Sequence, residues 1–324
     1  MPGYFAPDSM AVRVMSNRAV GLTYGQRALV IGAVHPRLFV GTVENTSHRE
    51  TPYKRLALTA RLFETVFLGS KDEADRALEF TRRKHATVVG DLPEDAGTHY
   101  PAGTHYDAND PYLMYMTMAF AFDSVDTMQN LLVRKLTPAE REALWQDFVT
   151  WAGLFGMPRE AAPATYAAFR TDFDGYLASD KPFLNEEAKV IGSYLAGTKR
   201  GDYNTPPPLR PLFRTIELVV QGSLPRKIRD MYGFRWTPAH AAAFRGVVAG
   251  TRALHVQPPL RAPHPLQPVL HGKNSELLKV VANQERRQLR RGRRSMPEAT
   301  DMRTAASERS ERSALVAEEE RRLG

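Results

Sequence analysis

The sequence predicts an all-α protein built as a single multi-helix bundle, because helix-capping signals recur along the chain and strand-like alternation is scarce. Ser70 with Glu73 and Thr137 with Glu140 fit the capping box, in which a hydroxyl and a carboxylate satisfy backbone amides at the start of a helix. Proline directly follows a capping residue at four sites, one of which is the second capping box: Thr51-Pro52, Asp110-Pro111, Thr137-Pro138 and Thr237-Pro238.

Taken in order, the expected helices cover residues 9–20, 26–46, 52–68, 71–89, 111–134, 138–155, 163–178, 185–196, 209–222 and 238–255. The run 26–46 is strongly apolar, but His35-Pro36 should kink or break it. Capping signals start the helices at 52, 71, 111, 138 and 238. Stripes at helical spacing support 163–178 and 209–222, and such stripes are more typical of core than of a cofactor box.

Composition limits the chemistry that the chain can carry. It has 324 residues, 43% of them apolar, nine His and no Cys, which excludes disulfides, thiolate nucleophiles, iron–sulfur clusters and Cys-type zinc sites. A metal or cofactor must be held by His, Met, Tyr or carboxylates. The first ten residues lack a secretory pattern, and the longest apolar stretch, Tyr112 to Phe122, is too short to span a bilayer. We therefore expect a soluble, cytoplasmic protein.

Five prolines between Val256 and Leu270 indicate the end of the compact domain, so we expect a domain over 1–270 and a charged, largely disordered or frayed tail over 271–324. The net charge of +8 is partly local, because residues 284–294 hold six Arg and one Glu. This tract could form an electrostatic patch for nucleic acid or anionic lipid. Without interleaved aromatic residues we expect no specific nucleic-acid partner, and peripheral membrane contact stays open.

Common catalytic motifs are missing from the sequence. It contains no HExxH, no P-loop or Rossmann glycine pattern and no GxSxG. A tandem repeat, GTHYPA and GTHYDA at 97–102 and 103–108, pairs His99 with His105. These two histidines could bind a metal, but a polar loop interrupted by Gly and Pro is enough to explain their presence.

His85 shares a helix face with Ala74, Leu78 and Thr81 and should point inward. Spacing alone leaves two readings, a core histidine with a satisfied hydrogen bond or an axial ligand to haem iron, and it favours the first.

Arg55 and Thr59 lie at positions i and i+4 and present to one side, whereas Lys54 and Arg61 should be solvated. An inward Arg needs an anion such as a carboxylate or a haem propionate, unless its head reaches solvent.

Read in order, several segments resemble the MpaB-type oxygenase family, which includes the rubber oxygenases known as latex clearing proteins. The resemblance covers about residues 8–270, and each motif is weak alone. The matching segments are RALVIGAVHP (27–36), RLALT (55–59), VFLG (66–69), KHATVVG (84–90), YDANDPYL (106–113), LTPAEREALW (136–145), GLFGMP (153–158) and SLPRKIRDMYGFRW (223–236).

This resemblance implies an all-helical domain with an internal pocket for haem b. His85, followed by Val88, falls on the family's proximal iron ligand, and Arg55 and Thr59 fall on its distal-side motif. It further implies an oxygenase that uses O₂ on a small apolar substrate, unsaturated or isoprenoid-like, with Arg55 at a haem propionate or at bound oxygen and Thr59 as a hydrogen-bond partner there. The sequence leaves the oligomeric state open.

Three positions depart from the rubber oxygenase pattern. Leu58 replaces the family's distal Lys, Val89 replaces an Arg after the proximal His, and Glu44 is a loose counterpart of the catalytic Glu. A Leu in the distal pocket would leave the sixth iron position open. The alternative function is a non-catalytic helical protein of the same fold that binds haem or a hydrophobic ligand.

Overall fold

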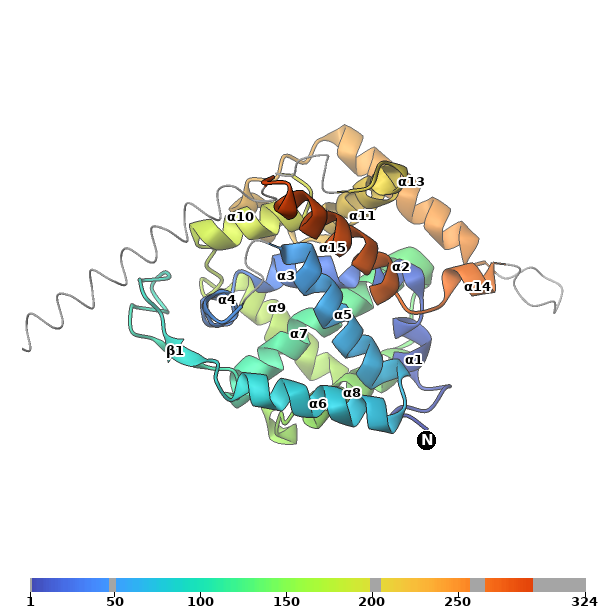
Figure 1. The fold of residues 1–324 in the computed structure, drawn as a ribbon. Coiled ribbons are helices and arrows are strands. Elements are labelled where there is room, and N and C mark those ends of the chain that lie inside the picture. Colours follow the sequence, from blue (N-terminus) through green and yellow to red (C-terminus); the bar gives the residue numbers. More distant parts are fainter. Residues whose placement is uncertain (1, 47–50, 199–204, 257–265, 294–324) are drawn as a thin grey trace, which may run out of the picture.

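The computed structural model describes residues 2–46, 51–198, 205–256 and 266–293, and within them helices form nearly all of the regular structure, as predicted (Figure 1). The helices are α1 (Met10–Met15), α2 (Arg18–Gly21), α3 (Tyr24–Gly32), α4 (Pro36–Glu44), α5 (Pro52–Leu68), α6 (Lys71–His85), α7 (Pro111–Met128), α8 (Pro138–Leu154), α9 (Tyr166–Ala178), α10 (Glu186–Leu195), α11 (Arg210–Ser223), α12 (Arg226–Tyr232), α13 (Pro238–Leu254), α14 (Gln267–Leu270) and α15 (Ser275–Arg290). Two strands, β1 (Val89–Asp91) and β2 (His105–Asp107), pair antiparallel, with Gly90 opposite Tyr106.

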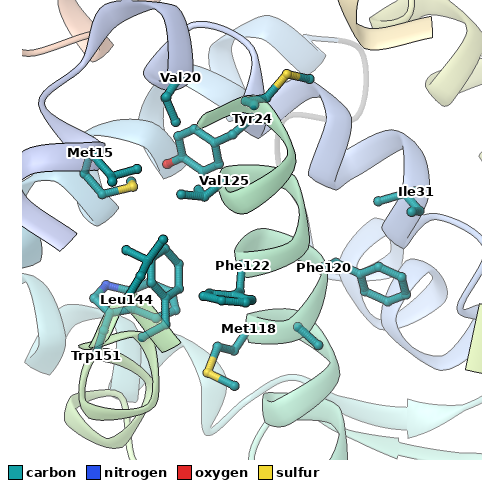
Figure 2. Close-up of a cluster of buried hydrophobic side chains, with 14 of the residues drawn as sticks. Met15, Val20, Tyr24, Ile31, Met118, Phe120, Phe122, Val125, Leu144 and Trp151 are labelled. Atoms are coloured by element: carbon teal, nitrogen blue, oxygen red, sulfur yellow. The ribbon is translucent and has the colours of Figure 1, made fainter. Parts of the chain in front are cut away.

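Helix α7 forms the centre of the bundle (Figure 1). It is apolar on nearly every side, which is typical of a helix surrounded by others. Phe120 leaves it toward Ile31 of α3, and Phe122 leaves on the other side toward Leu144 of α8 (Figure 2). The central helix thus separates two layers of helices and fixes α3 relative to α8.

Several predicted helices are confirmed closely, and others are divided. Residues 52–68 form one helix, and both predicted capping boxes are present. The expected helix 9–20 is split because the Asn17 side chain accepts a hydrogen bond from the Ala19 amide at 2.9 Å and starts a new helix. The apolar run 26–46 breaks before Pro36, which becomes the first residue of α4, as its missing N–H predicts.

Helix α6 ends at His85, four residues before its predicted end. The chain then becomes β1, whose partner β2 comes from the second copy of the tandem repeat. The prediction of a loop throughout residues 97–108 was therefore wrong for His105 to Asp107, because pairing with β1 satisfies their backbone groups.

Helix α15 lies side by side with α5 (Figure 1), whereas the sequence predicted only frayed helix or disorder for this segment. Leu278, Val281 and Ala282 form its buried face, so the expectation of a flexible tail after residue 270 was wrong for 275–290. The rest of that expectation, residues 294–324, lies outside the described residues. Arg286, Arg287 and Arg290 are exposed on the opposite face, and membrane contact through them stays a prediction.

Two buried carboxylates join α5 and α15 reciprocally. Glu64 of α5 accepts hydrogen bonds from the Asn274 and Ser275 amides at the start of α15. Glu285 of α15 accepts the amides of Tyr53 at 3.5 Å and Lys54 at 3.0 Å at the start of α5. Each helix therefore caps the other's N-terminus, where backbone donors are otherwise unpaired.

Within the described ranges, no helix combines the length and the apolar character that a membrane crossing needs.

Candidate functional site

A cavity of about 380 Å³ lies inside the bundle, and its walls come mostly from apolar side chains of α3, α4, α5, α7, α8 and α10. Leu278 of α15 completes one wall. The three residues singled out in the sequence, His85, Arg55 and Thr59, all lie on its surface. Enclosed apolar cavities with a few convergent polar groups are the usual form of a small-molecule site.

His85 reaches the cavity from the last turn of α6. Ala74, Leu78 and Thr81 on the same face are buried, which confirms the predicted inward face. Burial lowers the pKa of His85, although Asp107 opposes this effect, so the imidazole is neutral at neutral pH. The half-buried ring has no hydrogen-bond partner among the described residues, and a neutral imidazole is the form that ligates metals.

Arg55 enters the cavity from the first turns of α5. Burial alone lowers the pKa of Arg55 to about 10, and no carboxylate pairs with it in the described part of the chain. A guanidinium at this pKa still carries its charge at neutral pH. The cavity therefore holds a cation that a bound anionic group would stabilise.

Thr59 lies one turn further along α5, and its position on the same wall confirms the predicted shared face with Arg55. Thr65 donates its hydroxyl to the Arg61 carbonyl at 2.8 Å, as threonines in helices often do. Within the described residues the Thr59 hydroxyl has no such bond, so it is free for a ligand in the cavity. Arg61 is exposed as predicted, whereas Lys54 is half-buried.

The three positions that depart from the rubber oxygenase pattern lie outside the cavity wall. Leu58 is 49% exposed and Val89 is 46% exposed, and Glu44 is exposed at the end of α4. The expectation of a leucine in the distal pocket was therefore wrong. One residue along a helix rotates the side chain by about 100°, so Leu58 points away from the side that Thr59 faces.

The tandem-repeat histidines bind carboxylates at the surface instead of each other. His99 Nε2 lies 2.7 Å from Asp180 Oδ1, and His105 Nδ1 lies 2.8 Å from Asp91 Oδ1. Across the described ranges, no group of three or more His, Asp or Glu could hold a metal ion together. A ligand set for an isolated metal ion at this repeat is thus unsupported, and among the described histidines His85 is the one that lines the cavity.

Two further polar groups on the cavity wall escaped the sequence analysis. Gln26 of α3 is 1% exposed, and Trp151 of α8 is 4% exposed. The amide atoms of Gln26 and the Nε1 of Trp151 are buried without a hydrogen-bond partner in the described residues. No motif marks them, because each lies in an otherwise ordinary apolar segment; only the cavity brings them together.

An all-helical fold with an apolar cavity of this kind is typical of a small-molecule-binding or catalytic domain. The chain belongs to the family described as ER-bound oxygenase mpaB/B'/rubber oxygenase, catalytic domain, whose model matches residues 12–253. It is thus an oxygenase-family domain, and at that level an oxidoreductase. No curated protein and no solved structure matches the chain. Helix α15, which supplies Leu278, lies beyond the matched segment.

Proposed function

We propose that the protein is a haem b-dependent oxygenase that uses O₂ on a small apolar substrate, unsaturated or isoprenoid-like, with His85 as the iron ligand. The observation that carries the proposal is that His85, Arg55 and Thr59 meet on one apolar cavity of an oxygenase-family domain, and that the described residues offer Arg55 no carboxylate and the Thr59 hydroxyl no acceptor.

The residues present fit haem b in chemical character. Haem iron needs a protein ligand, and the imidazole of His85 would hold it. The faces of the macrocycle need apolar contacts, which side chains such as Met118 and Phe120 of α7 supply. The propionates need a cation, and Arg55 is charged and without a carboxylate partner.

Bound haem would supply the oxygen chemistry. The protein's own residues would bind the cofactor and the substrate, orient them and exclude water. His85 would hold the cofactor from the end of α6. Arg55 would pair with a haem propionate or polarise the oxygen substrate, and the Thr59 hydroxyl would donate a hydrogen bond inside the cavity. The apolar walls would exclude water and align an apolar chain.

The alternative remains a non-catalytic protein of the same fold that binds haem or a hydrophobic ligand. One observation favours it: none of the described residues that line the cavity is a carboxylate, and Glu44, the loose counterpart of the family's catalytic Glu, is exposed outside the cavity wall. An acid–base step inside the cavity would have to use another group.

Oxygen consumption separates the two functions. Haem-loaded protein is mixed with unsaturated isoprenoid lipids in an oxygen electrode, and the products are analysed by mass spectrometry for added oxygen. We expect substrate-dependent uptake that is lost in His85→Ala. Stoichiometric haem binding with no uptake on any of these lipids would favour the binding protein and overturn the oxygenase.

A further inference from the structure

Exposed apolar side chains gather where α13 and α14 end. Val256 and Val269 are 69% and 66% exposed, the highest values among the large apolar side chains of the described residues, and Leu254 is 50% exposed. Single exposed apolar residues are common on protein surfaces, whereas a group of them is typical of an interaction site. This region is therefore a candidate for contact with a partner.

The ends of α13 and α14 lie close together because both contact Asn17 of α2. The Asn17 side-chain amide lies 3.0 Å from Nε2 of His255, which follows α13, and the Asn17 backbone pairs with that of His271, which follows α14. Figure 1 shows α14 beside α2, at the end of α13. Val256 and Val269 thus flank one region of the surface, although they are distant in the sequence.

A groove of about 590 Å³ lies between these helix ends and α1. Apolar side chains of α1 and α14 form part of its wall, and none of the described residues that line it is a carboxylate. Arg134 on the groove pairs with Glu140 at 2.6 Å. Arg13 is exposed, and its one hydrogen-bond partner among the described residues is the Met10 sulfur at 3.9 Å. The groove therefore joins apolar walls to a positive charge that no carboxylate compensates.

The chain segments that build this surface contain no acidic residues. The two longest stretches of the sequence without Asp or Glu are residues 9–43, which include α1 and α2, and residues 231–275, which include α13 and α14. Arg245 in the second stretch is exposed on α13 and forms no ion pair with the described residues. The local charge is therefore positive, and it would attract an anionic surface.

The exposed side chains decide between the partners that carry negative charge. Sites for single-stranded nucleic acid stack the bases on aromatic rings, but Leu254, Val256 and Val269 are aliphatic. A second copy of this chain would bring the same positive charge against the surface. An anionic bilayer offers headgroups that attract arginine and an apolar interior that takes up aliphatic side chains. The combination of charge and aliphatic residues thus favours the bilayer.

We propose that the protein docks peripherally on an anionic lipid bilayer through the surface formed by Leu254, Val256, Val269, Arg13 and Arg245. Docking requires neither haem nor oxygen, so this inference goes beyond the proposed function and does not rest on it. It also uses a different part of the molecule from the exposed arginines of α15.

This docking surface lies near one end of the cavity. Asn17 begins α2, and Gly21 and Leu22 at the other end of this four-residue helix line the cavity. A helix of that length spans only about 6 Å. Docking would therefore hold the cavity beside the bilayer, the phase in which an apolar compound is most soluble.

The test measures how tightly the full-length protein, as purified, binds vesicles in a flotation assay. Vesicles of phosphatidylcholine alone are compared with vesicles of phosphatidylcholine mixed with phosphatidylserine. We expect the wild type to bind the mixed vesicles about tenfold more tightly, because each arginine near an anionic surface contributes about fivefold. Added salt should weaken the binding, since it screens exposed charges.

Substitutions at exposed positions leave the buried core intact and locate the surface. Val256→Ser combined with Val269→Ser should weaken binding by about tenfold, because two apolar side chains no longer enter the bilayer. Arg245→Gln should weaken it by about fivefold. Val280→Ser and Arg287→Gln, at exposed positions of α15, are the matched controls and should leave binding unchanged.

The chain has no cysteine, so a single introduced cysteine can carry a fluorescent dye at a chosen position. A dye on Val256→Cys should be quenched by vesicles that contain a spin-labelled lipid, whereas a dye on Val280→Cys should not. The reverse pattern would show that α15 meets the bilayer and would overturn the inference.

Three further results would overturn the inference: equal binding to the two kinds of vesicle, unchanged binding after Val256→Ser with Val269→Ser, and no binding to the mixed vesicles. The last of these would leave an acidic protein as the partner of this surface. Failure of the proposed function has a different signature, because a protein that takes up no haem would still bind the mixed vesicles.

Discussion

Two arginines enter the interior of the bundle, and their surroundings differ. Arg27 of α3 donates to the Asp123 carboxylate, to the Ser124 hydroxyl and to the Ser223 carbonyl. Asp123 also pairs with Arg170 of α9. Arg55 of α5 faces an apolar cavity and has no carboxylate partner in the described residues.

This difference separates polar groups that stabilise the fold from polar groups that await a ligand. Burial raises the pKa of Asp123, but the charges of Arg27 and Arg170 outweigh it and hold that pKa below its usual range, so the charges of this network are compensated internally. On the cavity wall, Arg55 and Thr59 have no side-chain hydrogen-bond partner among the residues that the structure describes. Substitutions in the first region should lower stability, whereas those in the second should change binding.

The largest effect is expected for Asp123→Asn. This change leaves Arg27 buried without its anion, and breaking a buried pair in this way costs about 3–5 kcal/mol. Unfolding in urea measures this loss of stability. Asp174→Asn is the control, because Asp174 pairs with the same Arg170 but is exposed and should cost below about 1 kcal/mol. Equal costs for the two variants would contradict an internally compensated network.

A smaller effect is expected at the seam of α5 and α15. Burial raises the pKa of Glu285 to about 7, against the amides of Lys54 and Tyr53 that favour its charged form. Because the folded pKa is raised, its contribution to stability is fully present below pH 4.5 and is lost as pH rises through 7. The Glu285→Gln variant lacks this pH dependence. The free energy of unfolding of the variant, relative to that of the wild type, should therefore rise by about 1–3 kcal/mol between pH 5 and pH 8.

Thermal and urea unfolding at the two pH values measure this change. Glu276→Gln on the exposed face of α15, where Glu276 pairs with Lys279, is the matched control and should show no relative rise. If the stability of Glu285→Gln relative to the wild type fell as pH rises, the Glu285 carboxylate would instead be charged over the whole pH range and stabilise the helix start in that form.

The smallest effect on stability is expected for Arg55→Met. No buried anion loses its partner, so the free energy of unfolding of the haem-free protein should change by less than about 1 kcal/mol. Haem affinity should fall about tenfold, because a propionate loses a charge-assisted hydrogen bond. Arg61→Met, on the exposed side of α5, should change neither quantity. A loss of stability as large as that of Asp123→Asn would show that Arg55 stabilises the fold and does not await a ligand.

The sequence predicted the parts of the fold that depend on local signals. Capping residues located the starts of α5, α6, α7, α8 and α13, and helical spacing placed His85, Arg55 and Thr59 on inward faces. The pairing of β1 with β2 and the docking of α15 on α5 depend on contacts between distant segments. The Arg-rich composition of 284–294 concealed the apolar face of α15, whose buried residues alternate with the charges.

The candidate site divides in the same way. The resemblance to the family's motifs identified three residues that line the cavity. It also placed Leu58 in the distal pocket, but the Leu58 side chain is exposed and lies outside the cavity wall. Gln26 and Trp151 could not be predicted, because an unpaired buried group is recognised only when its surroundings are known.

The most direct test of the central claim is a haem titration followed in the Soret region. Wild type, His85→Ala and His99→Ala are compared, since His99 lies on the surface repeat and pairs with Asp180. The account predicts stoichiometric binding by the wild type and His99→Ala, and loss of the ligated spectrum in His85→Ala. A folded wild type that takes up no haem, or a His85→Ala variant with an unchanged spectrum, would contradict it.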